Sequence, residues 1–207
     1  MGLSDWLGRF VASVREASLY GGATERETDA AGTDDGPGEI RSHRVHADRD
    51  GDFVVFHIGM RVNALWKVHR WLPIALVAPR MVRELEADPD SGLLGSRTVV
   101  GPGLRNVGFV QYWRSFEALR AYARDSDRLH VAAWREYTQS PTNDEAAVGI
   151  WHETYLVEDG AYETVYNNMP PFGLAASDGA DVAPATGRHE TAAGRVGERA
   201  DEGPPAP

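Results

Sequence analysis

The chain has 207 residues, 42% hydrophobic and 9% aromatic, which is enough for one globular domain of ordinary size with polar tails. It contains no cysteine, so disulfides, zinc–thiolate sites and thiol nucleophiles are excluded. The net charge of −10 lies mostly in residues 21–39, with −5, and residues 178–207, with −3; residues 40–177 are nearly neutral and offer no basic face for nucleic acid.

The first 20 residues predict an amphipathic helix, because apolar side chains recur at three- and four-residue spacing from Leu3 to Val14. Residues 21–39 are rich in Gly, Asp and Thr and predict a flexible acidic linker. Residues 178–207 have a similar composition and predict a disordered tail. No apolar run is long enough to span a membrane and the N-terminus lacks the apolar centre of a signal peptide, so we expect a cytoplasmic protein.

The folded domain is expected over residues 40–177. Apolar alternation predicts a strand over 52–62, and helical spacing then predicts a helix over 71–88, with Pro73 in its first turn. Short strands are predicted over 92–103 and 106–115. Ser115 is expected to cap a helix that runs to about residue 137, and a last strand follows over 147–157. This β-α-β-β-α-β order predicts an α+β domain of the ferredoxin-like type.

Two helices on one face of a four-stranded sheet would leave the other face uncovered. The first and last predicted strands carry apolar or aromatic side chains on both faces. A soluble monomer rarely exposes so large an apolar surface, and a symmetric pair of subunits would bury it twice at once. We therefore expect a homodimer that packs sheet against sheet.

The second predicted helix carries three rings on one side. His130, Trp134 and Tyr137 follow one another at spacings of four and three residues, which places them on one helix face. In one interpretation His130 lies at a pocket between helix and sheet, as a base, a hydrogen-bond donor or a haem ligand. In the other, this is an aromatic helix face that contains a hydrogen-bonded core histidine.

The last predicted strand carries two titratable neighbours, His152 and Glu153. Because side chains alternate along a strand, the two should project from opposite sides of the sheet and cannot form a catalytic pair. The sequence contains no HExxH zinc motif. One of the two residues is expected to face the helices and a pocket, and the other the subunit interface, where Glu153 could instead form an ion pair with Arg61 or Arg97.

The segment after this strand, YNNMPPFGLA, cannot be a regular strand or helix. Its Asn168 could present an amide to a substrate carbonyl, or the loop could hold the C-terminus over the end of the domain. Tryptophans at positions 66, 71 and 113 are core residues in one interpretation and a ligand platform in the other.

No phosphate-binding loop, dinucleotide fingerprint, metal-spaced carboxylate cluster or nucleophile elbow is present in the sequence. An enzyme with this sequence would therefore work without an organic cofactor, by removing a proton from an electron-rich substrate, or would bind haem through His130.

Three separated blocks, residues 63–95, 110–137 and 148–175, resemble the monooxygenase-like family that includes the fumagillin-pathway polyketide monooxygenase of fungi. The resemblance covers roughly residues 50–175 and leaves out the tails. It implies the dimeric α/β-barrel superfamily, which also contains antibiotic-biosynthesis monooxygenases. The candidate site positions that the resemblance implies are Trp66, Trp113, His130, Trp134, His152, Glu153 and Asn168.

The resulting expectation is an oxygenase that acts on a hydrophobic, aromatic or polyketide-like small molecule, with His130 as base or proton relay and His152 or Asn168 stabilising an oxyanion. The alternative is a dimeric barrel without catalytic activity that binds a small molecule or haem, as a carrier or a stress-associated protein. The expected catalytic positions are His130, His152, Glu153 and Asn168. The expected substrate-binding rings are Trp66, Trp113, Trp134, Tyr137 and Trp151.

Overall fold

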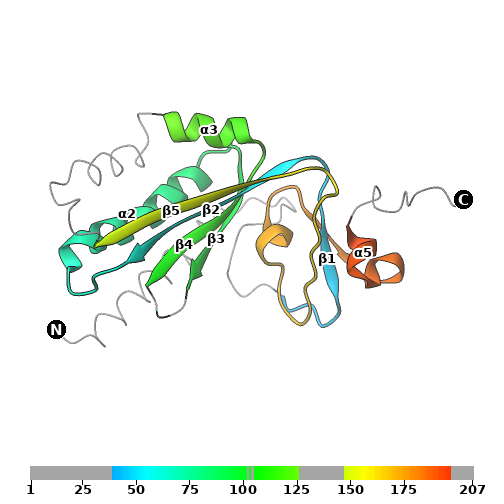
Figure 1. Cartoon of the computed structure of the whole chain (residues 1–207). Coiled ribbons are helices and arrows are strands. Elements are labelled where there is room, and N and C mark those ends of the chain that lie inside the picture. The colour runs from blue at the N-terminus through cyan, green and yellow to red at the C-terminus, as the bar shows by residue number, and fades with distance from the viewer. Residues whose placement is uncertain (1–38, 102, 104, 126–146, 197–207) are drawn as a thin grey trace, which may run out of the picture.

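The computed structural model describes residues 39–101, 103, 105–125 and 147–196. Its strands and main helices are shown in Figure 1. In chain order they are β1 (Val45–Asp48), β2 (Phe53–Val62), α2 (Val68–Glu86), β3 (Leu93–Val100), β4 (Asn106–Trp113), α3 (Phe116–Arg124), β5 (Val148–Val157) and β6 (Asp181–Pro184). Three short helical segments, η3 (Gly173–Ala176), η4 (Gly187–Glu190) and α5 (Ala192–Arg195), follow β5.

The larger sheet confirms the predicted architecture. Its four antiparallel strands are arranged in the order β3-β4-β2-β5, so the first and third strands of the β-α-β-β-α-β unit lie in the middle of the sheet. That order is the ferredoxin-like arrangement that the sequence predicted. All four predicted strands are present within two or three residues of their expected ends.

Both helices cover the same face of this sheet. The end of α2 and the middle of α3 supply Leu85 and Leu119, which pack with Val54 and Trp113. The first turns of α2 supply Trp71, which packs with Met60 and other residues near the opposite end of the strands. Two core clusters therefore lie between the helices and the sheet, one toward each end.

The helices differ from their predicted bounds. Helix α2 begins at Val68, where the sequence predicted Trp71, so Pro73 lies inside the helix and beyond its first turn. The Trp71 side chain is 2% exposed and donates its indole N–H to the carbonyl of Leu65 at 3.1 Å. Helix α3 has the predicted cap, since the hydroxyl of Ser115 accepts from the amide of Ala118 at 3.2 Å. Residues 126–146 lie outside the described part of the chain.

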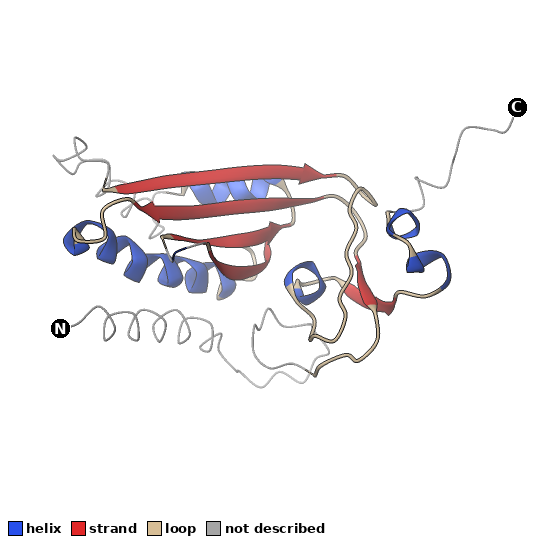
Figure 2. Ribbon diagram, turned by 60° about the horizontal axis from the view of Figure 1, so that its bottom comes forward, coloured by secondary structure: helices blue, strands red, loops and turns tan. Residues whose placement is uncertain are grey.

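A second sheet was not predicted. Strands β1 and β6 pair antiparallel from Val45–Pro184 to Asp48–Asp181, and Figure 2 shows this small sheet beyond one end of the larger one. The prediction of a disordered tail from residue 178 is therefore wrong for residues 178–196, where Ala180 and Ala185 are buried. A polar composition does not exclude burial here, because the buried side chains are small alanines and the segment is held by backbone pairing with β1. The predicted helix over 1–20, most of the linker over 21–39, and residues 197–207 are outside the described part.

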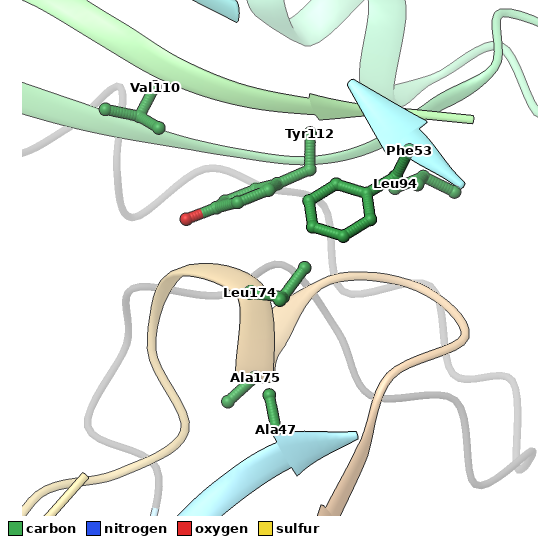
Figure 3. Packing of buried hydrophobic residues seen from close by; sticks show 7 residues of the cluster. All are labelled: Ala47, Phe53, Leu94, Val110, Tyr112, Leu174 and Ala175. Carbon is green, nitrogen blue, oxygen red and sulfur yellow. The ribbon is translucent and has the colours of Figure 1, made fainter. Parts of the chain in front are cut away.

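The face of the larger sheet opposite the helices is partly covered by the chain itself. Leu174 and Ala175 of η3 pack with Phe53 and Tyr112, and Ala47 of β1 closes the cluster from below (Figure 3). We expected this whole face to be uncovered. The C-terminal segment instead buries the part formed by β3 and β4, where Val110 is only 3% exposed.

No helix in the described ranges is both long enough and apolar enough to cross a membrane.

Candidate functional site

Strand β5 carries the two titratable candidates on opposite faces of the sheet, as the alternation predicted. His152 lies opposite Ile58 of β2, and Glu153 lies opposite His57. Residues that pair directly across an antiparallel ladder project to the same side. His152 therefore projects to the side of the helices, where its ring lies 5.7 Å from that of Phe56. Glu153 projects to the other side.

On the helix side, the pair formed by Ile58 and His152 lies between the two core clusters. Along β2, Val54 and Phe56 belong to the cluster at one end of the strand, and Met60 to the cluster at the other. Ile58 lies between them and is half-buried, whereas His152 is exposed. Farther along the same face of β5, Leu156 is 68% exposed. An apolar surface with one imidazole at its centre is therefore accessible on this side.

This surface, formed by Phe56, Ile58, His152, Thr154 and Leu156, has a composition suited to a hydrophobic ligand. Four of its members offer carbon surface, and Thr154 adds a hydroxyl. Imidazole is the side chain that most often transfers protons in enzymes, and it can also donate a hydrogen bond to an oxyanion. We call these five residues the helix-side surface.

On the opposite side, Glu153 belongs to a different group of residues. The hydroxyl of Tyr155 donates to Oε2 of Glu153 at 2.7 Å, and the Tyr155 ring meets that of His57 edge-on at 5.9 Å. The hydrogen bond to the Glu153 carboxylate raises the pKa of the Tyr155 phenol above its ordinary value, and the negative charge acts in the same direction. Neither Arg61 nor Arg97 is bonded to Glu153 within the described ranges; Arg61 bonds Asn63 and Asn106 instead.

Trp151 lies on this opposite side too. A side-chain carbon added at Gly59 would come within 2.8 Å of the Trp151 indole, so the ring lies directly over that glycine. We call Trp151, Glu153, Tyr155 and His57 the open surface, because the C-terminal segment does not cover them.

The remaining candidates are distributed over distant parts of the fold. Trp113 is 0% exposed and donates its indole N–H to Gln111 at 3.1 Å, so it is a core residue. Trp66 is 76% exposed, in the turn before α2. Asn168 is exposed and adopts a φ of 56°, a left-handed conformation that Asn tolerates better than most residues, which gives it a structural role in the loop.

The structure does not assemble the whole predicted site. Among the described residues, no hydrogen bond, ion pair or ring contact joins His152 to Glu153 or to Asn168. His130, Trp134 and Tyr137 fall within residues 126–146, outside the described part. The same ranges contain no group of three or more His, Asp or Glu side chains suited to a metal ion.

Two residues of the open surface were absent from the predicted site, His57 and Tyr155. Their signal was the alternation itself, since Tyr155 follows Glu153 by two positions and so shares its face. His57 could be placed opposite Glu153 only once the register between β2 and β5 was known. Register depends on long-range pairing, which a single strand pattern does not specify.

Comparison with known proteins identifies relatives. The family described as "Monooxygenase af470-like" matches residues 53–174, which include the whole four-stranded sheet and both helices. The curated protein "Monooxygenase af470" of Aspergillus fumigatus is 29% identical over 153 residues, 67% of this chain and 50% of that protein, so the chain spans about half the length of this relative. A solved structure described as "Crystal structure of aldoxime dehydratase" aligns with a TM-score of 0.45 and 16% identity, over 77% of this chain and 43% of that one.

Proposed function

Because the chain belongs to the Monooxygenase af470-like family, we propose that it is a monooxygenase-like enzyme that acts on a hydrophobic small molecule at the helix-side surface. One observation supports this location above others. His152 is an exposed, titratable group within an apolar surface, between two packed clusters and inside the matched region. Binding sites for small organic molecules commonly combine apolar walls with a few polar groups.

In the proposed reaction, the substrate is an electron-rich aromatic or polyketide-like compound and molecular oxygen is the oxidant. Loss of a proton from the substrate leaves an enolate or phenolate, which gives up electrons to oxygen more readily. One oxygen atom then replaces two hydrogen atoms of the substrate as a carbonyl, and the other oxygen atom leaves with those hydrogens as water, so the substrate itself supplies all the electrons. His152 would donate a hydrogen bond to that oxyanion. Phe56 and Ile58 would hold the apolar part of the substrate. His130 is retained as the proposed base, and no organic cofactor is required.

The test is oxygen consumption by the full chain with a panel of phenols and polyketide-like aromatics. For any compound that is turned over, His152→Ala should lower kcat/KM by roughly 10²- to 10⁴-fold. His69→Ala, which removes an exposed histidine at the start of α2, should leave it unchanged. If Glu153→Gln abolishes turnover while His152→Ala does not, the site lies on the other face of the sheet. Protein from haem-supplied cells is compared in parallel, because a Soret band lost in His130→Ala would identify a haem enzyme or carrier.

We also propose a homodimer that forms through the open surface. Tyr155 is 50% exposed there and its ring meets that of His57, and among the described residues the core cluster under the C-terminal segment does not include them. A second copy would bury the same rings on both subunits. Light scattering should give a dimer mass for the wild type and the 22.6 kDa chain mass for Tyr155→Arg. Leu156→Arg is the matched control, since Leu156 is 68% exposed on the opposite face. A wild-type monomer would contradict the dimer.

A further inference from the structure

Two imidazole rings stack inside the small C-terminal sheet region. His46 of β1 and His189 of η4 lie nearly parallel, with ring centroids 4.4 Å apart and an interplanar angle of 15°. His46 is only 5% exposed, and Nδ1 of His189 is buried without a hydrogen-bond partner in the described ranges. These two rings connect β1, near the start of the described chain, to its last helical segments.

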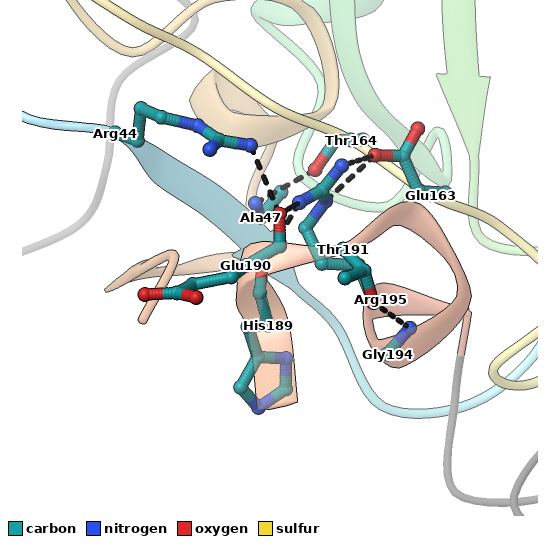
Figure 4. Close-up of polar contacts among 9 residues, drawn as sticks. All are labelled: Arg44, Ala47, Glu163, Thr164, His189, Glu190, Thr191, Gly194 and Arg195. Atoms are coloured by element: carbon teal, nitrogen blue, oxygen red, sulfur yellow. Dashed lines mark hydrogen bonds and ion pairs between the residues drawn. The ribbon is translucent and has the colours of Figure 1, made fainter. Parts of the chain in front are cut away.

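The segment from Gly187 to Val196 is held against the domain by a small number of polar contacts. Arg195 forms an ion pair with Glu163 at 2.5 Å, which joins the segment to the domain. Within the segment, Arg195 also donates to the carbonyls of His189 and Glu190 at 2.8 and 3.0 Å. Arg44 donates to the same Glu190 carbonyl at 3.1 Å, so two guanidinium groups meet at one turn (Figure 4).

Two arginines lie close to the two rings. Arg188 donates from Nε to Nε2 of His189 at 3.0 Å, so Nε2 serves as an acceptor and must be unprotonated for this bond to form. Arg195 adds a second cation close to the rings. Of the acidic groups around them, Asp48 on β1 favours a charged His46, Glu163 is already paired with Arg195, and Glu190 is exposed.

Protonation of His46 is therefore opposed by its surroundings. A proton on Nε2 of His189 would turn the acceptor of the Arg188 bond into a second donor. A charge on His46 would be buried beside a second ring and near Arg195. If both rings were charged, two cations would lie 4.4 Å apart.

We propose that the His46–His189 stack is a pH-sensitive latch, which holds residues 187–196 against β1 when both rings are neutral and releases this segment when they become protonated. Release would break the ion pair of Arg195 with Glu163 and the hydrogen bond from Arg44 to the Glu190 carbonyl, and would uncover His46. The larger sheet and its helix-side surface do not depend on the latch, so the rest of the fold should remain intact.

The direction of the pH dependence follows from His46. Burial lowers its pKa below the ordinary 6.5, and the neighbouring His189 and Arg195 lower it further, while the Ala47 backbone and Asp48 act in the opposite direction. Once the segment is released, His46 has an ordinary pKa. The released state therefore binds a proton at His46 more readily than the closed state does. The latch is fully stable above about pH 6.5 and loses stability as the pH falls below that value toward the lower pKa of the closed state.

Hydrogen exchange of the full chain, corrected for the intrinsic effect of pH, tests this proposal at about pH 7.5 and about pH 5.5. Protection of the peptide covering residues 187–196 should fall roughly tenfold at the lower pH, while the peptide covering β2 keeps its protection. His46→Phe and His189→Phe keep an aromatic ring but remove titration, so either variant should abolish the pH effect. His69→Phe replaces an exposed histidine of α2 and is the matched control. This variant should keep the pH effect on the protection of residues 187–196.

Unchanged protection of residues 187–196 in the wild type would overturn the proposal. A fall that persists in both phenylalanine variants would also overturn it, because another group would then be responsible. If one variant does not fold, the other variant and the imidazole NMR signals of the wild type can still show whether the two histidines cause the loss of protection. These signals should titrate at the pH at which the segment loses protection, and titration at an unrelated pH would contradict the latch.

Discussion

His152 and Glu153 are neighbours in the chain but project from opposite faces of one sheet. His152 contacts the ring of Phe56 on the helix side, and Glu153 accepts a hydrogen bond from Tyr155 on the other side. Because of this separation, variants at the two positions report on two different surfaces. Loss of turnover in one variant and loss of dimerisation in the other can therefore be told apart.

Trp113 and Trp66 allow the effect of a core tryptophan on the free energy of unfolding to be compared with that of a surface tryptophan. Trp113 is 0% exposed, and its replacement by Ala should lower the free energy of unfolding by about 3–5 kcal/mol because a large cavity remains. Trp66 is 76% exposed, and the same substitution should change it by less than about 0.5 kcal/mol. Urea unfolding measures both. A large loss for Trp66→Ala would show that the ring is covered in solution by a partner or another segment.

Gly108 of β4 is constrained by the neighbouring strand. A methyl group there would meet the backbone of β2, 2.3 Å from the carbonyl oxygen of Ile58 and 2.8 Å from the Cα of Gly59. Gly108→Ala should therefore lower the free energy of unfolding by about 1–3 kcal/mol or more, because the backbones of β4 and β2 must move apart. The methyl group of Gly149→Ala would have its nearest neighbour, in the Asn63 side chain, at 3.8 Å, which is an ordinary contact. This variant should change the free energy of unfolding by no more than about 0.5 kcal/mol. Equal stabilities for the two variants would show that the β2–β4 register differs from the one described.

The phenol of Tyr155 should titrate above its ordinary pKa of 10.0 as long as it donates to Glu153. Glu153→Gln removes the negative acceptor and should lower the Tyr155 pKa toward that ordinary value. Glu158→Gln, in an exposed residue beyond the end of β5, is the control and should leave it unchanged. NMR of the labelled phenol carbon follows the titration. A Tyr155 pKa that is the same in the wild type and in Glu153→Gln would show that the hydrogen bond does not form in solution.

Removal of the C-terminal segment tests whether it belongs to the fold. A chain that ends at Ser177 loses β6, the pairing with β1 and the buried side chains of Ala180 and Ala185. A loss of about 2 kcal/mol would lower Tm by roughly 4–8 °C in a chain of this size. A chain that ends at Val196 keeps every contact described here and is the control. The same Tm for both chains would mean that β6 contributes no stability.

The order of the elements and the faces of the strands could be read from local patterns. Side chains alternate along every strand, so the separation of His152 from Glu153 and the shared face of Val54, Phe56 and Met60 followed without any tertiary information. The Ser115 cap followed from its position before a helical pattern. Each of these features depends on residues within a few positions of one another.

The tertiary structure decided which distant segments meet. Ala47, Ala175, Ala180 and Ala185 are small residues in a polar region, so no hydrophobic period marks them as core. The stack of His46 on His189 joins two segments that each resemble a polar turn when taken alone. What covers a sheet face depends on long-range packing, and its free energy comes from contacts that neither segment makes until both are in place. The sequence by itself therefore determined the β-α-β-β-α-β unit, and the tertiary structure alone decided that residues 178–196 complete the fold.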